Sequence, residues 1–204
     1  MVDWNRRYRE SGQRLFGSLP NEYLREVLAR SDVDPRRVLC LGDGDGRNGT
    51  WLAGEGCRVT AVDVSAVATE QAVALDRAAG VTVERVTADL ADWRPGGGDT
   101  WDAVAMIYLQ CEETVRSRAI AESAAALDDG GWFIAEGFSR AGVDADSPGP
   151  KSPDLLYYLH DIAAALPGFR IVEAFDGAVW LEEGARHRGH AFVVRVLARK
   201  LPAA

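Results

Sequence analysis

The chain has 204 residues, a formal net charge of −8 and 47% hydrophobic residues. This length predicts one domain over residues 1–204, able to bury a core without disulfides or bound metal. Nucleic acids usually bind a basic face, and no run of Lys and Arg is clustered along this sequence. The acidic balance therefore argues against DNA or RNA as a partner.

Neither a signal peptide nor a membrane-spanning segment is expected, because no apolar run of sufficient length occurs. The three cysteines, Cys40, Cys57 and Cys111, lie in or beside apolar segments, at a spacing that matches no metal site. Buried thiols in a reducing compartment are the simplest interpretation. We therefore expect a cytoplasmic protein with no membrane partner and no metal ion.

Residues 1–30 predict a helical cap. Between Asn21 and Arg30, apolar residues recur at helical spacing. Trp4 and Tyr8 precede that helix and are candidates for the wall of an acceptor pocket. Ordinary packing of an amphipathic helix would explain both aromatic residues equally well.

Residues 36–139 alternate between apolar strands and helical stretches, which predicts a cofactor-binding core. Strands end near Gly42, Asp63, Thr87 and Tyr108, and a fifth begins at Phe133. Parallel strands need long crossover connections, and helices of the predicted lengths supply them.

Residues 140–204 predict an acceptor-side loop, a helix and a terminal strand pair. The stretch 182–188 separates two β-rich segments, 169–181 and 191–198. A connection this short joins antiparallel strands. The whole pattern predicts an α/β fold: one doubly wound, mostly parallel seven-stranded sheet with a C-terminal antiparallel pair and an N-terminal helical cap.

Three glycines, Gly42, Gly44 and Gly46, follow the first strand. Such a turn needs backbone angles with positive φ, and a ligand on it needs the absence of side chains. The helix that starts near Arg47 points free N–H groups toward the same place. Asp63 ends the second strand, where a carboxylate accepts both ribose hydroxyl protons. The alternative is an ordinary tight turn, with Asp63 capping the next helix.

Two cofactor classes compete for this turn. Counted from Gly42, the pattern is Gly-x-Gly-x-Gly followed by Arg47, whereas the dinucleotide fingerprint places a glycine at the position of that arginine. A bulky side chain there would obstruct a pyrophosphate. The turn therefore favours S-adenosylmethionine over NAD.

The segment from Val38 to Asn48 resembles the first motif of class I S-adenosylmethionine-dependent methyltransferases. Residues 88–90, 101–107 and 130–136 resemble later segments of that superfamily, in the same order. A narrower resemblance links residues 4–8, 16–21, 149–157, 187–190 and 197–200 to small bacterial methyltransferases related to the tellurite-resistance proteins. Asp43 departs from the pattern, because many members of the superfamily carry Cys or Ala there.

The resemblance implies S-adenosyl-L-methionine as cofactor and S-adenosyl-L-homocysteine as product. It implies these cofactor-binding residues: Gly42, Asp43, Gly44, Gly46, Arg47, Asn48, Asp63, Val64, Asp89, Leu90 and Ile107. Asp89 is equally interpretable as a helix cap or a solvated turn residue.

Further acceptor-pocket candidates come from the C-terminal third. Lys151 and Tyr157 lie in or after the loop 142–153, whose length is typical of a lid, although a solvated excursion also explains it. Arg186, His187 and Arg188 could form an anion-binding edge or a polar hairpin turn in water. His187 and His190 lack an apparent third ligand for a metal ion. The catalytic candidates are Tyr8, His187 and Arg188.

The sequence therefore predicts methyl transfer from S-adenosylmethionine to a small-molecule acceptor. The sulfonium is already activated, so most of the acceleration would come from in-line placement. The tellurite-type resemblance implies a chalcogen oxyanion as acceptor, and a thiol, a small acid or a natural-product intermediate fits the sequence as well. A non-catalytic S-adenosylmethionine-binding domain and an NAD-dependent oxidoreductase are the alternatives.

Overall fold

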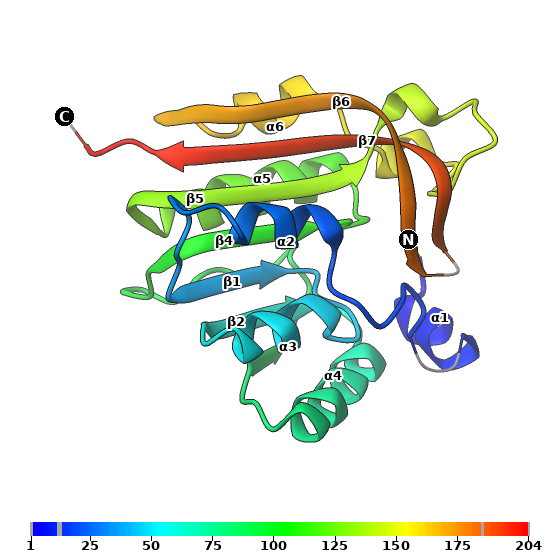
Figure 1. The fold of residues 1–204 in the computed structure, drawn as a ribbon, viewed down its shortest axis with the longest axis horizontal. Coiled ribbons are helices and arrows are strands. Elements are labelled where there is room, and N and C mark those ends of the chain that lie inside the picture. The colour runs from blue at the N-terminus through cyan, green and yellow to red at the C-terminus, as the bar shows by residue number, and fades with distance from the viewer. Residues whose placement is uncertain (1, 12–13, 185, 204) are drawn as a thin grey trace.

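The computed structural model describes residues 2–11, 14–184 and 186–203, so Ala185 of the expected hairpin turn lies outside the described residues. Seven strands form one sheet in the order β3-β2-β1-β4-β5-β7-β6 (Figure 1). All neighbours pair in parallel except β5 with β7 and β7 with β6, so β7 alone runs against the rest. This confirms the mostly parallel sheet with a terminal antiparallel pair. The strands are β1 (Arg37–Leu41), β2 (Arg58–Asp63), β3 (Glu84–Thr87), β4 (Trp101–Ile107), β5 (Leu127–Phe138), β6 (Phe169–Gly184) and β7 (His187–Lys200).

Helices cover both faces of the sheet. One buried cluster joins α2 and α3 to residues such as Val38 and Val59, and another joins α5 and α6 to Leu39 and Val104. Figure 1 shows α2 and α3 on the near face and α5 and α6 behind the sheet. The α-helices are α1 (Trp4–Glu10), α2 (Glu22–Leu28), α3 (Arg47–Gly54), α4 (Ala66–Ala79), α5 (Glu113–Ala125) and α6 (Leu159–Ala164), with short 3₁₀ turns η1 (Arg140–Gly142) and η2 (Pro153–Leu155).

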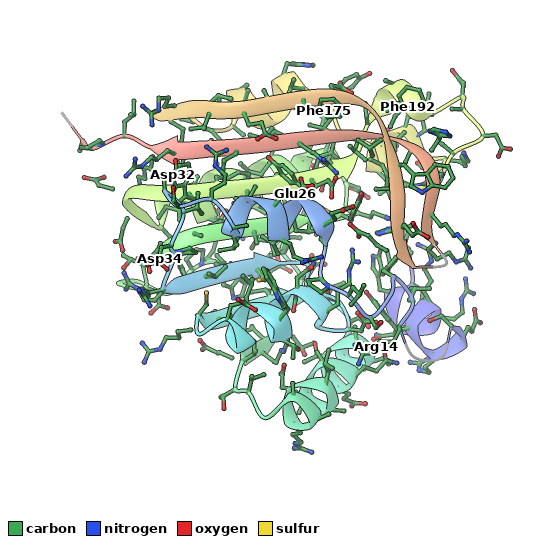
Figure 2. The ribbon with its side chains drawn as sticks, viewed as in Figure 1. Arg14, Glu26, Asp32, Asp34, Phe175 and Phe192 are labelled. Atoms are coloured by element: carbon green, nitrogen blue, oxygen red, sulfur yellow. The ribbon has the colours of Figure 1, made fainter. Side chains whose placement is uncertain are left out.

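Side-chain caps fix where several helices begin. Asp3, Asn21 and Ser65 accept hydrogen bonds from backbone N–H groups three residues later. Such caps satisfy N–H groups that have no partner within the helix. Figure 2 shows the outer, solvated side of the α2 layer, where Glu26, Asp32 and Asp34 are exposed.

The strands near the C-terminus are longer than the sequence predicts. β5 begins at Leu127, because Leu127 pairs with Trp101 before a register shift restores regular pairing at Trp132. The intervening residues 128–131, Asp-Asp-Gly-Gly, have a composition typical of a turn. β6 and β7 continue almost to the tip of the hairpin, and this end of the hairpin curves toward α1 (Figure 1).

Shortly after α1, the backbone at Gly17 contacts the backbone of the β6–β7 hairpin. Gly17 has φ +102°, and a Cβ on it would lie 1.6 Å from the Glu183 carbonyl oxygen. Only glycine allows this backbone-to-backbone contact. The N-terminal segment and the C-terminal hairpin are therefore packed together beside the ends of the central strands.

Among the described residues, no helix combines the length and apolar content that a membrane crossing requires.

Candidate active site

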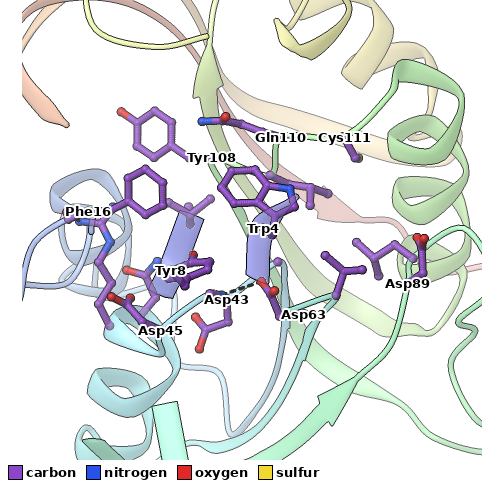
Figure 3. A pocket seen from close by; sticks show the side chains of 18 of the residues that line it. Trp4, Tyr8, Phe16, Asp43, Asp45, Asp63, Asp89, Tyr108, Gln110 and Cys111 are labelled. Atoms are coloured by element: carbon purple, nitrogen blue, oxygen red, sulfur yellow. Dashed lines mark hydrogen bonds between the residues drawn. The ribbon is translucent and has the colours of Figure 1, made fainter. Parts of the chain in front are cut away.

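A pocket lies where β1, β2 and β4 end, under the cap helix α1 (Figure 3). Its empty volume is about 800 Å³, counting the part open to solvent. The position agrees with the rule that open α/β sheets bind ligands beyond the carboxyl ends of their strands. Its lining is Trp4, Tyr8, Phe16, Gly42, Asp43, Gly44, Asp45, Arg47, Asn48, Asp63, Val64, Asp89, Leu90, Ile107, Tyr108, Leu109, Gln110, Cys111, Val115 and His187.

The glycine turn forms the floor of the pocket. Gly42 and Gly44 have φ values of +69° and +59°, in the left-handed region that favours glycine. The Gly44 N–H donates to Asp63 Oδ2 at 2.8 Å, the dashed contact of Figure 3. A Cβ on Gly44 would lie 2.2 Å from the Tyr8 hydroxyl oxygen. The close approach of the cap helix therefore requires glycine here.

Gly46 does not line the pocket. A Cβ on Gly46 would lie 2.7 Å from the Ala72 Cβ, so this glycine allows α3 to approach α4. Its φ of +89° also places it as the N-cap of α3 without a side-chain cap. Gly46 therefore allows the N-terminus of α3 to lie beside the pocket.

Asp43 lines the pocket but is paired beneath it. Its carboxylate accepts from the Arg85 guanidinium and, at 3.0 Å, from the Gly49 N–H. Arg85 also donates to Asp76 at 2.9 and 3.0 Å and to Thr50 Oγ1 at 3.0 Å. The carboxylate at the position where the superfamily often has Cys or Ala is therefore balanced by an arginine from β3. The network holds the turn from below.

Asp63 ends β2 at the edge of the pocket. Its two carboxylate oxygens accept from the N–H groups of Ser65 and Gly44, both at 2.8 Å. Burial raises the pKa of Asp63 to about 6, even though these two hydrogen bonds lower it, and the carboxylates of Asp43 and Asp45 raise it further. Because each oxygen keeps a second lone pair, this group can still accept from a ligand's hydroxyls.

The far end of the pocket is flat and largely apolar. Val64, Leu90 and Ile107 line it together with Asp89. One carboxylate oxygen of Asp89 accepts the Ala91 N–H at 2.8 Å, as in a turn, and the other has no partner of this kind. Asp89 therefore both accepts a hydrogen bond within a turn and lines the pocket.

The cap contributes three aromatic rings. Trp4, Tyr8 and Phe16 lie with ring centroids 6.1, 6.3 and 6.5 Å apart, as in Figure 3. Asn5 fixes the helix that carries two of them, because its Oδ1 accepts from Ser65 Oγ at 2.9 Å and from the Val67 N–H at 3.2 Å. The cap is thus attached to the start of α4, directly after the Asp63 turn.

Arg47 and Asn48 line the pocket, but their side chains also hold the segment that follows the cap. Arg47 donates to the carbonyl oxygens of Phe16 and Leu19 at 3.2 and 3.3 Å. Asn48 Oδ1 accepts the Asn21 N–H at 2.9 Å. The first turn of α3 therefore ties the glycine turn to residues 16–21.

His187 is buried against the opposite end of the pocket. Its Nδ1 lies 3.5 Å from both Glu183 Oε2 and Arg47 Nη2, and Arg47 Nη2 lies 2.8 Å from the same Glu183 oxygen. Burial and the Arg47 charge hold the pKa of His187 below its usual value, although Glu183 raises it. Despite its burial, Glu183 has a pKa of about 2, because His187 and Arg47 stabilise its charged form. His187 is therefore neutral near pH 7, beside an ionised carboxylate.

Three polar atoms around the pocket are buried without a hydrogen-bond partner among the described residues: His187 Nε2, the Tyr108 hydroxyl and Asp45 Oδ2. Burying a polar group without a partner costs about 1–3 kcal/mol. Tyr108 also has φ +52°, an unusual value for a residue with a side chain. Such features are concentrated at sites that receive a ligand.

Three of the predicted residues, Lys151, Tyr157 and Arg188, lie outside the pocket lining. Lys151 is exposed and donates to the carbonyls of Ala145 and Ser147 within its own loop. Tyr157 is buried behind the pocket and donates to the Leu109 carbonyl at 2.6 Å. Arg188 is exposed, because alternate residues of a strand face opposite sides and its neighbour His187 faces inward.

The loop 142–153 does not line the pocket, so it is not seen as a lid. His190 also lies apart from His187: it is exposed and packs edge-on against Trp180 at 4.9 Å.

Several pocket residues lack a recognisable signal in the sequence. Phe16 comes from a segment distant along the chain, as does Glu183, which pairs with the lining residues Arg47 and His187, and Asp45 stands between two motif glycines without a role assigned to it. Only the alternation of β6 and the i, i+4 spacing of Glu183 and His187 could have pointed to their pairing.

Comparisons with known proteins agree with this geometry. Residues 38–131 match a family model described as a methyltransferase domain. No curated protein matches the sequence.

Solved structures share the fold at low identity. A S-adenosylmethionine-dependent methyltransferase from Clostridium acetobutylicum is 12% identical, with 98% of this chain and 96% of that chain covered and a TM-score of 0.67. The N-methyltransferase NodS from Bradyrhizobium japonicum is 17% identical over 89% and 93% of the two chains, with a TM-score of 0.67. NodS has also been solved with S-adenosyl-L-homocysteine.

TehB from Haemophilus influenzae is 18% identical, with a TM-score of 0.67. The match covers 82% of this chain and 58% of TehB. At such identities these likenesses establish the fold. Residues 38–131 match the model of a methyltransferase domain, and the chain has the fold of the S-adenosylmethionine-dependent methyltransferases.

Proposed function

We propose that the pocket binds S-adenosyl-L-methionine and that the protein transfers the cofactor's methyl group to a small-molecule acceptor. When bound, S-adenosylmethionine supplies a methyl group already activated on a sulfonium, and S-adenosyl-L-homocysteine is left as the product. The observation that carries the proposal is the contact between Gly44 and Asp63, 2.8 Å long, at the floor of an open pocket in a methyltransferase domain.

The described residues fit this cofactor. The carboxylate of Asp63 would accept the two ribose hydroxyl protons. Val64 and Leu90 would enclose the adenine, and the second oxygen of Asp89 would accept from its amino group. Gly42 and Gly44 present bare backbone, against which a methionine chain could lie.

The chain's contribution to the rate is placement of the acceptor and exclusion of water. Trp4, Tyr8 and Phe16 cover the pocket. His187 is the strongest candidate for a catalytic group, because its Nε2 has no partner and it borders the pocket. Burial raises the pKa of Tyr8 well above its ordinary value, so Tyr8 would act as a hydrogen-bond donor.

The acceptor is proposed to be small because the pocket is enclosed between the cap and the sheet. Among the described residues that line the pocket, Arg47 is the only Lys or Arg, which argues against a nucleic acid as acceptor, and the free cysteines suit a cytoplasmic protein. The fold shared with TehB keeps a thiol or a chalcogen oxyanion among the acceptors to be tested.

Calorimetric titration with S-adenosylmethionine, S-adenosylhomocysteine and NAD tests the proposal. We expect micromolar binding of both adenosyl ligands, lost in Asp63→Ala but retained in Asp92→Ala, whose side chain is exposed and outside the pocket. Binding of NAD alone would make the protein an oxidoreductase candidate instead. Binding of S-adenosylmethionine without turnover of any acceptor would favour the non-catalytic alternative.

A further inference from the structure

The acceptor end of the pocket is walled by aromatic rings. Trp4, Tyr8 and Phe16 form one side, and the wall continues through His187 to Tyr108, with centroids of Phe16 and His187 5.0 Å apart and those of His187 and Tyr108 4.3 Å apart. All five residues line the pocket. Such a wall favours a flat, apolar molecule, because stacked and edge-on ring contacts add to the gain from apolar burial.

The charges of the lining oppose an anionic acceptor. Arg47 is the lining's only cation among the described residues, and Glu183 neutralises it. Asp43 is neutralised by Arg85. Asp45, Asp63 and Asp89 then remain without an ion pair in the part of the chain that the structure describes.

A positively charged cofactor would offset one of these three carboxylates, and the remaining field would repel a second negative charge. Charges within a partly buried site interact far more strongly than in water. Tellurite, selenite and thiolates are therefore poorly matched to this pocket, whereas an uncharged acceptor meets no such opposition.

The unpartnered polar atoms indicate which neutral group fits. His187 Nε2 and the Tyr108 hydroxyl are both buried and unsatisfied. Glu183 Oε2 lies 2.8 Å from Arg47 Nη2 and 3.5 Å from His187 Nδ1. If Nδ1 carries the proton and faces Glu183, then Nε2 presents a lone pair to the pocket. A hydroxyl is a group that can donate to the lone pair of Nε2 and still accept a second hydrogen bond.

On the basis of the proposed function, we propose that the acceptor is an uncharged aromatic hydroxyl compound, whose ring lies against Trp4, Phe16 and Tyr108 and whose hydroxyl faces His187 Nε2. In the reaction, the hydroxyl oxygen forms a bond to the methyl carbon while the carbon–sulfur bond breaks and leaves its electron pair on sulfur. The hydroxyl proton passes to His187 Nε2, and the Glu183 carboxylate, which lies beside both groups, offsets the repulsion between the resulting imidazolium and the Arg47 guanidinium. The proton is released to water after the methyl ether leaves.

The first test is binding, independent of turnover. The full chain is saturated with S-adenosylhomocysteine at pH 8 and titrated with 2-naphthol, which is neutral, with 2-naphthoate, which has a similar shape and a negative charge, and with tellurite. We expect 2-naphthol to bind at least roughly tenfold more tightly than 2-naphthoate. Tighter binding of naphthoate or tellurite, or no binding of naphthol, would overturn the proposal. Failure of S-adenosylhomocysteine itself to bind would instead overturn the proposed function.

A matched pair of variants tests the role of charge. Asp45→Asn keeps the shape of the lining and removes one carboxylate, whereas Asp92→Asn removes an exposed carboxylate outside the pocket. We expect the preference for naphthol over naphthoate to fall several-fold in Asp45→Asn and to stay unchanged in Asp92→Asn. An unchanged preference in both variants would show that the lining charge does not select the acceptor.

Turnover tests the role of His187. We expect methyl ether formation from 2-naphthol and a loss of kcat of roughly 100-fold or more in His187→Gln, with the Kd for S-adenosylhomocysteine unchanged. The rate of the variant should then climb as rising pH ionises the naphthol, whereas the native rate should be nearly flat. A parallel pH response in both proteins, or methylation of tellurite or thiophenol but not of naphthol, would contradict the assignment.

Discussion

The carboxyl group of Asp63 is the residue whose ionisation we expect to control cofactor affinity. Its pKa is about 6 in the free protein, and the ionised form is the one that accepts ribose hydroxyl protons. Binding should therefore be strongest above that value and weaken by about tenfold per pH unit as the pH falls below it. Calorimetry with S-adenosylhomocysteine between pH 5 and 8 measures this dependence.

Asp63→Asn is the control for that pH series, because its amide does not titrate. It should bind weakly and with little dependence on pH over the same range. An affinity that increases as the pH falls in the native protein would contradict the role given to this carboxylate.

The pairing of Asp43 with Arg85 predicts a large effect on stability. Arg85→Met leaves the Asp43 and Asp76 carboxylates buried without their cation, and we expect the free energy of unfolding to fall by about 3–5 kcal/mol. Urea denaturation measures the loss. The double change Asp43→Ala with Arg85→Met removes part of the uncompensated charge, so it should cost less than the single one. An equal or greater loss in the double variant would contradict the argument.

At this scale the sequence predicts the residues of the glycine turn and Asp63, because their spacing follows from the chemistry of a turn and a strand end. It does not predict the partner of Asp43. Arg85 comes from β3, and nothing in the local sequence distinguishes it from a surface arginine. The sequence also does not predict that Tyr157 and Lys151 lie outside the pocket lining. A position in or after a loop does not determine which way a side chain faces.

At the scale of elements, α1 depends on its attachment to α4. It has seven residues, too few for a stable isolated helix, and Asn5 supplies two hydrogen bonds to the start of α4. Asn5→Ala should raise the Kd for S-adenosylhomocysteine by roughly tenfold, since each such bond contributes about 0.5–1.5 kcal/mol. The melting temperature should change little. Calorimetry and thermal unfolding measure the two effects.

Asn5→Asp keeps the accepting oxygen and serves as the matched control. It should retain most of the affinity that Asn5→Ala loses. Should both variants bind as tightly as the native protein, α1 would not be held through Asn5.

The order and type of the elements are well predicted, because hydrophobic periodicity and connection length constrain a doubly wound sheet. The fifth strand begins earlier than the sequence predicts. Asp128-Asp129-Gly130-Gly131 has the composition of a turn, and only the pairing of Leu127 with Trp101 extends the strand to Leu127. The meeting of α1 with the β6–β7 hairpin depends on long-range packing, which local patterns do not encode.

For the molecule as a whole, the negative pocket within a chain of net charge −8 predicts a preference between substrate and product. S-adenosylmethionine carries one more positive charge than S-adenosylhomocysteine. We expect it to bind about tenfold more tightly at low ionic strength, and this ratio should shrink as salt screens the charges. Paired titrations at low and high salt measure it. Equal affinities at low salt would contradict the electrostatic account.

The contact between Gly17 and the Glu183 backbone has a consequence for biosynthesis. During translation the cap leaves the ribosome early, whereas Glu183 and His187 emerge only after most of the chain has been made. β7, the last strand, must also enter between β5 and β6 to complete the sheet. A nascent chain that stops before this hairpin already holds the contacts of α1 with α4 and those of the glycine turn with Asp63 and Arg85. It lacks Glu183, His187 and the backbone that Gly17 contacts, so the His187 end of the pocket forms after its Asp63 end.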